Sequence, residues 1–412
     1  MIPRGRLDIG WSDLALAAAS CLVPGRREDM QRRVETLWAR GGDALACLSV
    51  RSGLDLLLTT LDYPKGTEVL VSAVTIRDIV RVVEHHGLVA VPVDLDMTTL
   101  TLDMGSLERA VNPRARLLLV AHLFGSRMPL DDVVRFAKER GLMLVEDCAQ
   151  SFTGLEYRGH DASDVSMFSF GPLKTSSALG GALLRIKDPE LRARMKALQS
   201  VRPVQGRRRF LNRVLRFAAV RLAMQPMPYT ALCAAARLLG RSHDDILNQS
   251  IRGFSGPAFF SNIRHQPPYP MLALLLRRLV RSDGSRVARR KAAAEAFERI
   301  MPGLPRPGRH AAHHSYWTFP IWSETPDQLV HDLDRCGFDS TRGAWSVYAV
   351  PSPAPYPHLS PTQALDGMRR LVYVPVYPEV ARPDLERLAH AIQAFEGSAR
   401  AAPSSAVLSS NG

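Results

Sequence analysis

Two short stretches decide the fold: VEDCAQ at residues 145–150, and FSFGPLK at residues 168–174, which a glycine pair at 180–181 follows. In the first stretch an apolar run ends in acids, as expected where a buried strand reaches the edge of a sheet. The second stretch ends a later apolar run and leads into a loop with Lys174. Open α/β sheets place ligands at the carboxyl ends of their strands. We therefore expect Asp147 and Lys174 to share one ligand site.

An aspartate followed by a lysine in this order suits pyridoxal phosphate (PLP). The lysine forms a Schiff base with this cofactor and later moves a proton, and the carboxylate keeps the pyridine nitrogen protonated so that the ring withdraws electrons. Taken alone, an aspartate at a strand end is more often a helix cap, and a loop lysine is more often a solvated charge. Together, Asp147 and Lys174 predict a PLP site.

Residues 44–187 alternate short apolar runs with helical periods, which is typical of βαβ units that build a mainly parallel sheet. Helices are expected at 51–61 and 130–140. Strands are expected at 69–72, 90–93, 116–121, 142–146, 166–170 and 181–186. This half of the chain therefore predicts an α/β fold.

Changes in composition divide the chain into five parts. We expect an N-terminal helical segment at 1–43, a large PLP-binding domain at 44–200, a helical insertion at 201–268, a linking helix with a small C-terminal α/β domain at 269–396, and a disordered tail at 397–412. In the last two parts the pattern predicts a basic helix at 277–298, a strand at 316–322, and helices at 327–336 and 382–395.

The insertion is both basic and apolar. Three arginines at 207–209 precede an apolar stretch at 217–239, in which Arg221, Arg237 and two prolines argue against a membrane-spanning helix. Two interpretations stay open. Residues 207–250 lie on an anionic membrane surface as a peripheral contact, or they form a subunit contact or a lid.

The formal net charge of +13 suits nucleic acid, an acidic membrane surface or an anionic substrate. No zinc-finger spacing or aromatic RNA-binding signature accompanies the arginines, so specific nucleic-acid binding is not expected. Five dispersed cysteines without a CxxC pair favour neither a disulfide framework nor a zinc site, and they suit a reducing cytoplasm. His310, His313 and His314 lack nearby acidic or thiol partners, so no metal site is expected there.

The motifs around Asp147 and Lys174 resemble those of the DegT/DnrJ/StrS family of sugar-nucleotide aminotransferases, within the fold-type I superfamily of PLP enzymes. The resemblance covers 44–187 and, more loosely, 260–395. It includes VLVSAVT at 69–75, VPVDLD at 91–96, HLFG at 122–125 and VPVYP at 374–378. It implies a large domain with a mainly parallel sheet flanked by helices, and a smaller C-terminal α/β domain.

The same resemblance implies roles for single residues. Lys174 would be the Schiff-base lysine and Asp147 the partner of the pyridinium. Gln150 would lie near the 3-hydroxyl of the cofactor, and Ser169 would bind its phosphate. Ile76 stands where relatives often carry an aromatic residue that stacks on the ring, so an aliphatic group would cover it.

A second phosphate contact is expected at the start of the helix after residue 47, because backbone N–H groups and the helix dipole attract anions there. Ser49, Arg51 and Ser52 stand where the family shows S-G-T, and an arginine could bind phosphate with two hydrogen bonds. Asn262 begins a match to the family motif N-Y-R, whose asparagine reaches the phosphate of the neighbouring subunit. The resemblance therefore implies a homodimer with sites at its interface.

Weaker matches place His314 and Arg342 near the substrate. The function implied is transfer of an amino group from an amino acid, glutamate first among donors, to a nucleotide-linked keto-sugar in the cytoplasm. Relatives that dehydrate keto-deoxysugars carry histidine at the lysine position, so Lys174 favours transamination. Two alternatives stay open: a lipid-linked or membrane-presented acceptor at the inner membrane face, and a non-catalytic regulatory relative.

Overall fold

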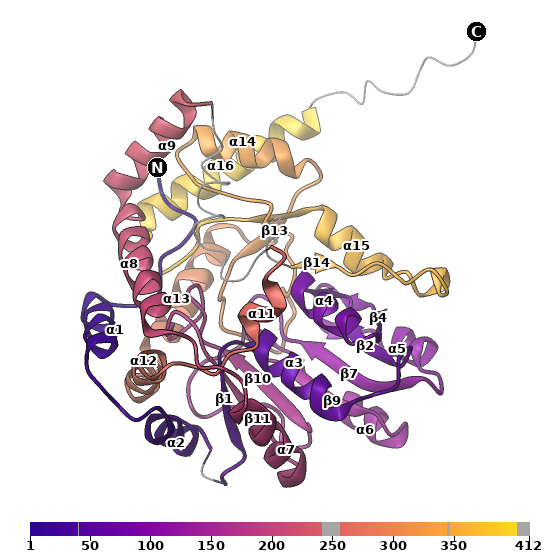
Figure 1. The fold of residues 1–412 in the computed structure, drawn as a ribbon. Helices are drawn as coiled ribbons and strands as arrows, with labels where there is room; N and C mark the ends of the chain where they lie inside the picture. Colours follow the sequence, from indigo (N-terminus) through magenta and orange to yellow (C-terminus); the bar gives the residue numbers. More distant parts are fainter. Residues whose placement is uncertain (40, 241–255, 344–346, 402–412) are drawn as a thin grey trace.

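The apolar runs of the first half form one seven-stranded sheet in the computed structural model, which describes residues 1–39, 41–240, 256–343 and 347–401 (Figure 1). The strands are β1 (Ala44–Cys47), β2 (Glu68–Ser72), β4 (Val89–Val93), β7 (Ala115–Ala121), β9 (Met143–Asp147), β10 (Val165–Ser169) and β11 (Ala182–Ile186). Their order is β1-β11-β10-β9-β7-β2-β4. Only β11 runs antiparallel to its neighbours β1 and β10. The prediction of a mainly parallel sheet is thus confirmed.

Helices cover both faces of this sheet because successive strand residues point to opposite sides. On β11, Leu183 packs into one apolar cluster and Leu184 into another. The cluster of Leu184 contains residues of α3 (Val50–Leu61), α4 (Arg77–His85) and α7 (Pro189–Ser200). The opposite face is covered by α1 (Trp11–Leu22), α2 (Arg27–Trp38), α5 (Met104–Ala110), α6 (Asp131–Glu139) and α12 (Tyr269–Val280).

Short strand pairs tie loops together at the rim of the sheet. The pairs are β3 (Val74–Thr75) with β14 (Tyr348–Ala349), β5 (Leu95–Asp96) with β6 (Thr101–Leu102), and β8 (Ser126–Arg127) with β12 (His313–His314). Two of these pairs join the large domain to segments beyond residue 310, so the C-terminal part folds back over the sheet.

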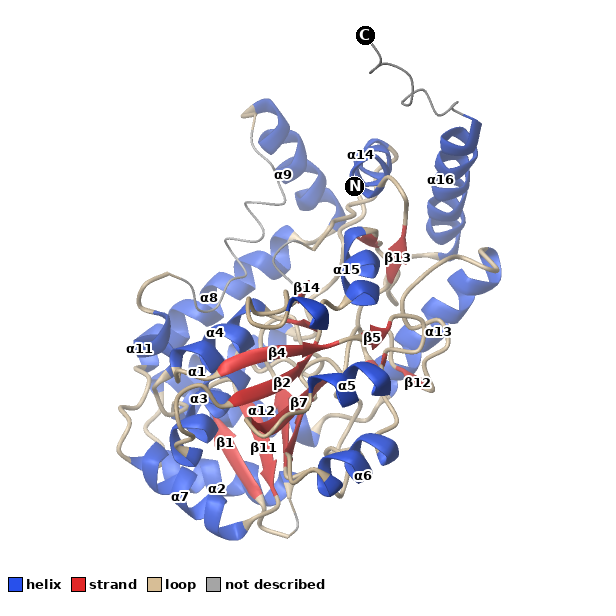
Figure 2. Cartoon of the chain, turned by 90° about the vertical axis from the view of Figure 1, so that its right-hand side faces the viewer, coloured by secondary structure: helices blue, strands red, loops and turns tan. Residues whose placement is uncertain are grey.

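The C-terminal part has an apolar cluster of its own, which includes Phe297, Phe319 and Leu388. The elements of the C-terminal part are α13 (Ser285–Ile300), β13 (Pro320–Trp322), α14 (Pro326–Arg335), η1 (Pro357–Leu359), α15 (Thr362–Arg369), β15 (Leu371–Tyr373) and α16 (Arg382–Ala401). Strands β13 and β15 pair antiparallel. Helices α14 and α16 lie with α9 at one end of the molecule, whereas α15 lies next to β4 (Figure 2).

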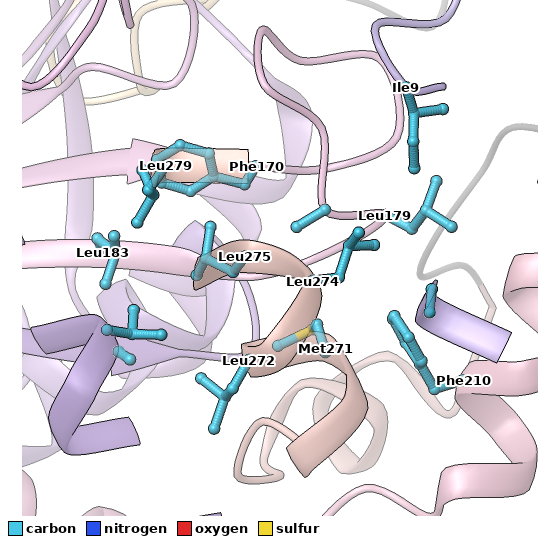
Figure 3. Packing of buried hydrophobic residues seen from close by; sticks show 14 of the residues in the cluster. Ile9, Phe170, Leu179, Leu183, Phe210, Met271, Leu272, Leu274, Leu275 and Leu279 are labelled. Atoms are coloured by element: carbon cyan, nitrogen blue, oxygen red, sulfur yellow. The ribbon is translucent and has the colours of Figure 1, made fainter. Parts of the chain in front are cut away.

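The insertion forms α8 (Arg207–Ala223) and α9 (Pro226–Leu238), and the short α11 (Phe259–Ile263) follows the undescribed residues 241–255. Helix α8 is anchored by Phe210, Val214 and Phe217, which occur at helical spacing and are almost fully buried. Phe210 belongs to the same cluster as Leu179 and the α12 residue Met271 (Figure 3). The insertion is therefore part of the core around the lysine loop.

Three boundaries were predicted wrongly. The single basic helix at 277–298 is two helices, because Asp283 accepts the N–H of Ser285 (3.0 Å) and Gly284 has a φ of +73°. The strand at 316–322 is reduced to β13, since Tyr316 has a φ of +50° that breaks an extended run. Helix α16 continues beyond 397 to Ala401, whereas 402–412 lie outside the described residues.

Candidate functional site

A cavity of about 750 Å³ opens at the carboxyl ends of the parallel strands. Strands β9 and β10 are paired in parallel with Met167 opposite Asp147, so Asp147 and Ser169 end their strands at the same edge of the sheet. The loop after β10 brings Lys174 into the lining of the cavity. The two residues that the sequence singled out are thus held by adjacent strands.

Asp147 is 7% exposed, and its Oδ1 accepts the N–H of Ala149 (2.9 Å). Burial raises the pKa of Asp147, and the Ala149 N–H and the charge of Lys174 oppose this rise only in part. A carboxylate in such surroundings is stabilised by a cation beside it. A protonated pyridine nitrogen would supply that cation, so Asp147 fits the cofactor that the sequence predicts.

Lys174 has a depressed pKa. Burial lowers the pKa of its amine to about 8, with Asp147 opposing the change and Arg51 adding to it. Its Nζ lies 3.9 Å from the ring centroid of Trp317, whose Nε1 donates to the carbonyl of Leu173 (3.0 Å). The lysine is thus directed over an aromatic face, and a large fraction of it is the neutral, nucleophilic amine near pH 8.

The depressed pKa predicts selective reactivity of Lys174. In apoprotein treated with an amine-specific acylating reagent, labelling of Lys174 should rise with pH around a midpoint near 8, because only the neutral amine reacts. Peptide mass spectrometry measures the labelled fraction of Lys174 at each pH, with the peptide of the exposed Lys187 as the recovery control in the same sample. A midpoint for Lys174 that lies well above 8 would contradict the prediction.

The start of α3 also lines the cavity. Ser49 caps this helix, with its Oγ accepting the N–H of Ser52 (3.1 Å). Arg51 follows in the first turn and pairs with Asp78. Ser49, Arg51 and Ser169 all line the cavity. A helix N-terminus with an arginine and two hydroxyl groups fits a phosphate, as predicted for the cofactor.

Gln150 and Ile76 also line the cavity. The Oε1 of Gln150 accepts the backbone N–H of Phe124 (2.8 Å), which fixes the orientation of the amide beside the site. Ile76 is the N-cap residue of α4. The structure therefore brings Lys174, Gln150, Ser169, Ser49, Arg51 and Ile76 to one cavity, whereas the buried Asp147 and Ser52 are not among its lining residues.

Three predicted residues lie elsewhere. Asn262 accepts a hydrogen bond from Arg209 (2.9 Å) away from the cavity, and its predicted role across a dimer interface remains a prediction. Arg342 donates to the carbonyl of Leu371 (2.9 Å) and to Asp327 (2.9 Å) instead of facing the cavity. His314 lines a separate, smaller cavity of about 250 Å³.

His314 is an improbable ligand for an anion because burial, with Arg306 nearby, lowers its pKa to about 3. Its strand β12 pairs with β8, and its Nδ1 accepts the N–H of Tyr316 (2.9 Å). The role predicted for His314 beside the substrate is therefore not supported by its position. Trp317, three residues later, occupies the place beside Lys174 instead.

Sequence reasoning missed several functional candidates. Trp317 lies in the segment that was expected near the substrate, so its neighbourhood gave a partial signal. Arg213 on α8 and Arg290 on α13 are buried and line the cavity, yet in the sequence they look like other arginines of basic helices. Only their burial distinguishes them.

Among the described residues, His122, Glu146 and Cys148 bring three potential metal-ligand atoms within 4.8 Å of one another. His122 Nε2 lies 3.0 Å from Glu146 Oε2, and Tyr157 donates its hydroxyl to the same oxygen (2.9 Å). His160 donates its backbone N–H to the other oxygen (2.7 Å). Protein groups thus already satisfy this carboxylate, and the cluster braces the end of β9 next to Asp147.

Several known proteins resemble this chain in sequence. The sequence profile described as "DegT/DnrJ/EryC1/StrS aminotransferase family" matches residues 31–231. The chain is 37% identical to the erythromycin biosynthesis sensory transduction protein EryC1 of Saccharopolyspora erythraea over 161 residues, which cover 37% of this chain and 44% of that protein. That match thus spans less than half of the relative. GDP-perosamine synthase of Caulobacter vibrioides is 24% identical over 372 residues, covering 85% of this chain and 84% of that enzyme.

Solved structures share the fold over nearly the whole chain. DesV of S. venezuelae has a TM-score of 0.65 at 24% identity, covering 93% of this chain and 94% of that one. The PLP form of the sugar aminotransferase Spr1654 from Streptococcus pneumoniae has a TM-score of 0.69 at 16% identity, covering 96% of this chain and 99% of that one. Residues 31–231 of the chain thus match the DegT/DnrJ/EryC1/StrS aminotransferase family in sequence.

Proposed function

We propose that this protein is a PLP-dependent aminotransferase that moves an amino group from an amino acid, glutamate first among donors, to a keto-sugar linked to a nucleotide. The observation that carries the proposal is Lys174, with a pKa near 8, which shares one cavity with a phosphate-type helix start and interacts electrostatically with the buried Asp147. Relatives with matching sequences include GDP-perosamine synthase and a dTDP-amino-sugar transaminase of Streptomyces venezuelae.

Each residue has a distinct task in the proposed reaction. When bound, PLP supplies an electron sink that makes exchange of an amino group feasible. Lys174 Nζ takes up and returns the proton at the reacting carbon, for which a pKa near the working pH is suited. The Asp147 carboxylate stabilises a positive charge on the group bound beside it. Arg51, Ser49 and Ser169 bind the phosphate and thereby fix the register of the ring against Lys174.

Two side chains shape the surroundings of the amine. Ile76 presents an aliphatic surface to the cavity and excludes water from that side. Trp317 holds Nζ over its ring, which keeps the lysine inside the site while it is not bonded to a ligand. The excess of arginine in the lining favours a substrate with phosphate groups.

An acceptor screen tests this proposal. The holoenzyme is incubated with ¹⁵N-glutamate and a panel of nucleotide-linked keto-sugars, and mass spectrometry follows the ¹⁵N label. We expect at least one labelled amino sugar and an equal amount of 2-oxoglutarate. Label in no sugar, with 2-oxoglutarate still formed, would point to a different acceptor, and a protein that forms neither product with any donor would overturn the assignment as an aminotransferase.

A second proposal concerns the insertion: α8 and α9 bind an anionic membrane surface at the inner face of the membrane. Arg208, Leu215 and Leu222 are spaced seven residues apart on α8 and are exposed, so they share one stripe. Met227 and Leu238 of α9 are 84% and 88% exposed. No helix among the described residues is both long and apolar enough to cross a membrane. A surface contact is therefore the form of binding that we propose.

Vesicle sedimentation tests the membrane contact. The double variant Leu215→Ser, Leu222→Ser removes the apolar stripe without touching the buried face of α8, whereas deletion of α8 would remove Phe210 and Phe217 from the core. We expect the double variant to lose binding to phosphatidylglycerol vesicles, and Leu365→Ser on α15, also exposed, to retain it. Equal binding of all variants, or a change in oligomeric state alone, would assign the stripe to a subunit contact instead.

We also propose a homodimer, as the Asn262 motif implies. Asn262 is only partly buried within its own chain, so its amide is accessible to a neighbouring subunit. Analytical ultracentrifugation should give twice the 45.5 kDa mass of the chain. A sedimenting species of single-chain mass at micromolar concentration would contradict this proposal.

A further inference from the structure

Arg290 is a buried cation that forms no direct ion pair with a carboxylate of the described residues. It lies on α13 at 7% exposure and lines the same cavity as Lys174. Its Nη1 donates to the hydroxyl of Thr175 (3.0 Å), the residue directly after the lysine. Its Nε and Nη2 are buried and have no hydrogen-bond partner among the described residues. A guanidinium in this state is strongly destabilising unless an anion joins it.

The carboxylates nearest to Arg290 are already engaged by other groups. Asp8 accepts hydrogen bonds from Arg278 (2.9 Å) and from the backbone N–H of Ser176 (2.8 Å). Glu379 accepts one from Arg286 (2.9 Å), one helical turn before Arg290. Each of these two carboxylates is therefore already paired with another arginine, and Arg290 is left without an ion-pair partner among the described residues.

The rest of the cavity lining also carries more positive than negative side chains. Among the described residues of its lining, ten side chains are basic and two are acidic. The phosphate-type site of Ser49, Arg51 and Ser169 belongs to α3 and the end of β10, whereas Arg290 comes from α13 of the C-terminal part. Two anion sites on different elements suit a cofactor phosphate and, separately, an anionic group of the substrate.

We propose that Arg290 binds an oxyanion of the substrate, with its free Nε and Nη2 as the two donors. This inference rests on the proposed function in that the bound molecule is a transamination substrate. The oxyanion is the carboxylate of the amino donor or a phosphate of the acceptor, both of which accept a guanidinium with two parallel hydrogen bonds. The contact of Nη1 with Thr175 couples the position of the oxyanion to the loop that carries Lys174.

Calorimetric titration of the PLP-loaded protein with two probes tests the subsite and separates the two sources. Pyrophosphate represents the acceptor and glutarate the donor, and the cofactor already occupies its own phosphate site. We expect Arg290→Gln to weaken binding of one probe by about 10- to 100-fold, as for loss of a charge-assisted hydrogen bond. Arg290→Lys, which retains the charge but not the two-donor geometry, should give a smaller loss.

Arg289→Gln is the matched control, because Arg289 precedes Arg290 on α13 but is exposed. It makes the same charge change and should leave both titrations unaltered. Equal loss in both glutamine variants, no loss in Arg290→Gln, or an effect confined to cofactor retention would overturn the subsite. The titrations need no turnover, so a protein that binds a probe through Arg290 but transfers no amino group would refute the proposed function and leave the oxyanion site standing.

Discussion

Replacing Lys174 by alanine is expected to lower the transamination rate by at least about a thousandfold, because the side chain supplies both the covalent link to the cofactor and the proton transfer. The visible absorbance band of lysine-bound PLP should vanish at the same time. Stability should change little, since the amine extends into a cavity and makes its main contact with the Trp317 ring. Steady-state kinetics and absorbance spectra measure the two effects.

The exposed Lys187 provides the matched control. Lys187→Ala removes one lysine and the same charge from the end of β11 and should retain the band and the activity. A Lys174→Ala protein that keeps the band would mean that another lysine carries the cofactor. A loss of both properties together with a lowered melting temperature would show a folding defect, and Lys174→Gln would then replace it as the test variant.

Replacing Asp147 by asparagine is expected to lower the rate by about 100- to 1,000-fold, the loss that follows removal of one buried electrostatic contact to a reacting group. The asparagine keeps the size of the side chain and can still accept the N–H of Ala149, so the fold should persist. The neutral amide cannot stabilise a positive charge beside it as the carboxylate does. Cofactor affinity, measured by equilibrium dialysis, should therefore fall together with the rate.

Asp161→Asn serves as the control, since Asp161 is exposed and lies in the loop between β9 and β10. Asp147→Glu restores the charge at a displaced position and should recover part of the lost activity. If Asp147→Asn and Asp161→Asn have equal rates, Asp147 is not the partner of the cofactor ring. This result would leave the cavity and Lys174 in place but would remove the electrostatic part of the account.

The parallel half of the fold was predictable because its signals are local. Strands β7 and β9 contain the apolar runs LLLV at 117–120 and MLV at 143–145, and α6 between them has a clear apolar period. Strand β1 was missed because ALAC is short and lacks β-branched residues, so only its pairing with β11 defines it. The break between α12 and α13 was missed because the basic composition runs on through it, and the turn at Gly284 alone separates the helices.

The residues of the site also fall into two classes: those that the local sequence marks and those that only the folded structure identifies. Asp147, Ser169 and Lys174 were found because each stands at the end of a strand or in the loop just after it, a position that the sequence marks. Arg342 was misplaced because its neighbours Thr341 and Gly343 do line the cavity, while its own donors turn back to the carbonyl of Leu371 and to Asp327. Arg290 could not be found from sequence, because its role depends on which other charges are already paired in the folded chain.

The most direct test of the central claim is the half-reaction at Lys174. The protein is purified, loaded with PLP and mixed with each of a set of amino acids in the absence of acceptor, while absorbance and keto-acid formation are recorded. We predict that at least one donor removes the lysine-linked band and yields one keto acid for each site, and that Lys174→Ala yields none. A protein that takes up no PLP, or one that binds PLP through Lys174 yet releases no keto acid with any donor, would contradict the account.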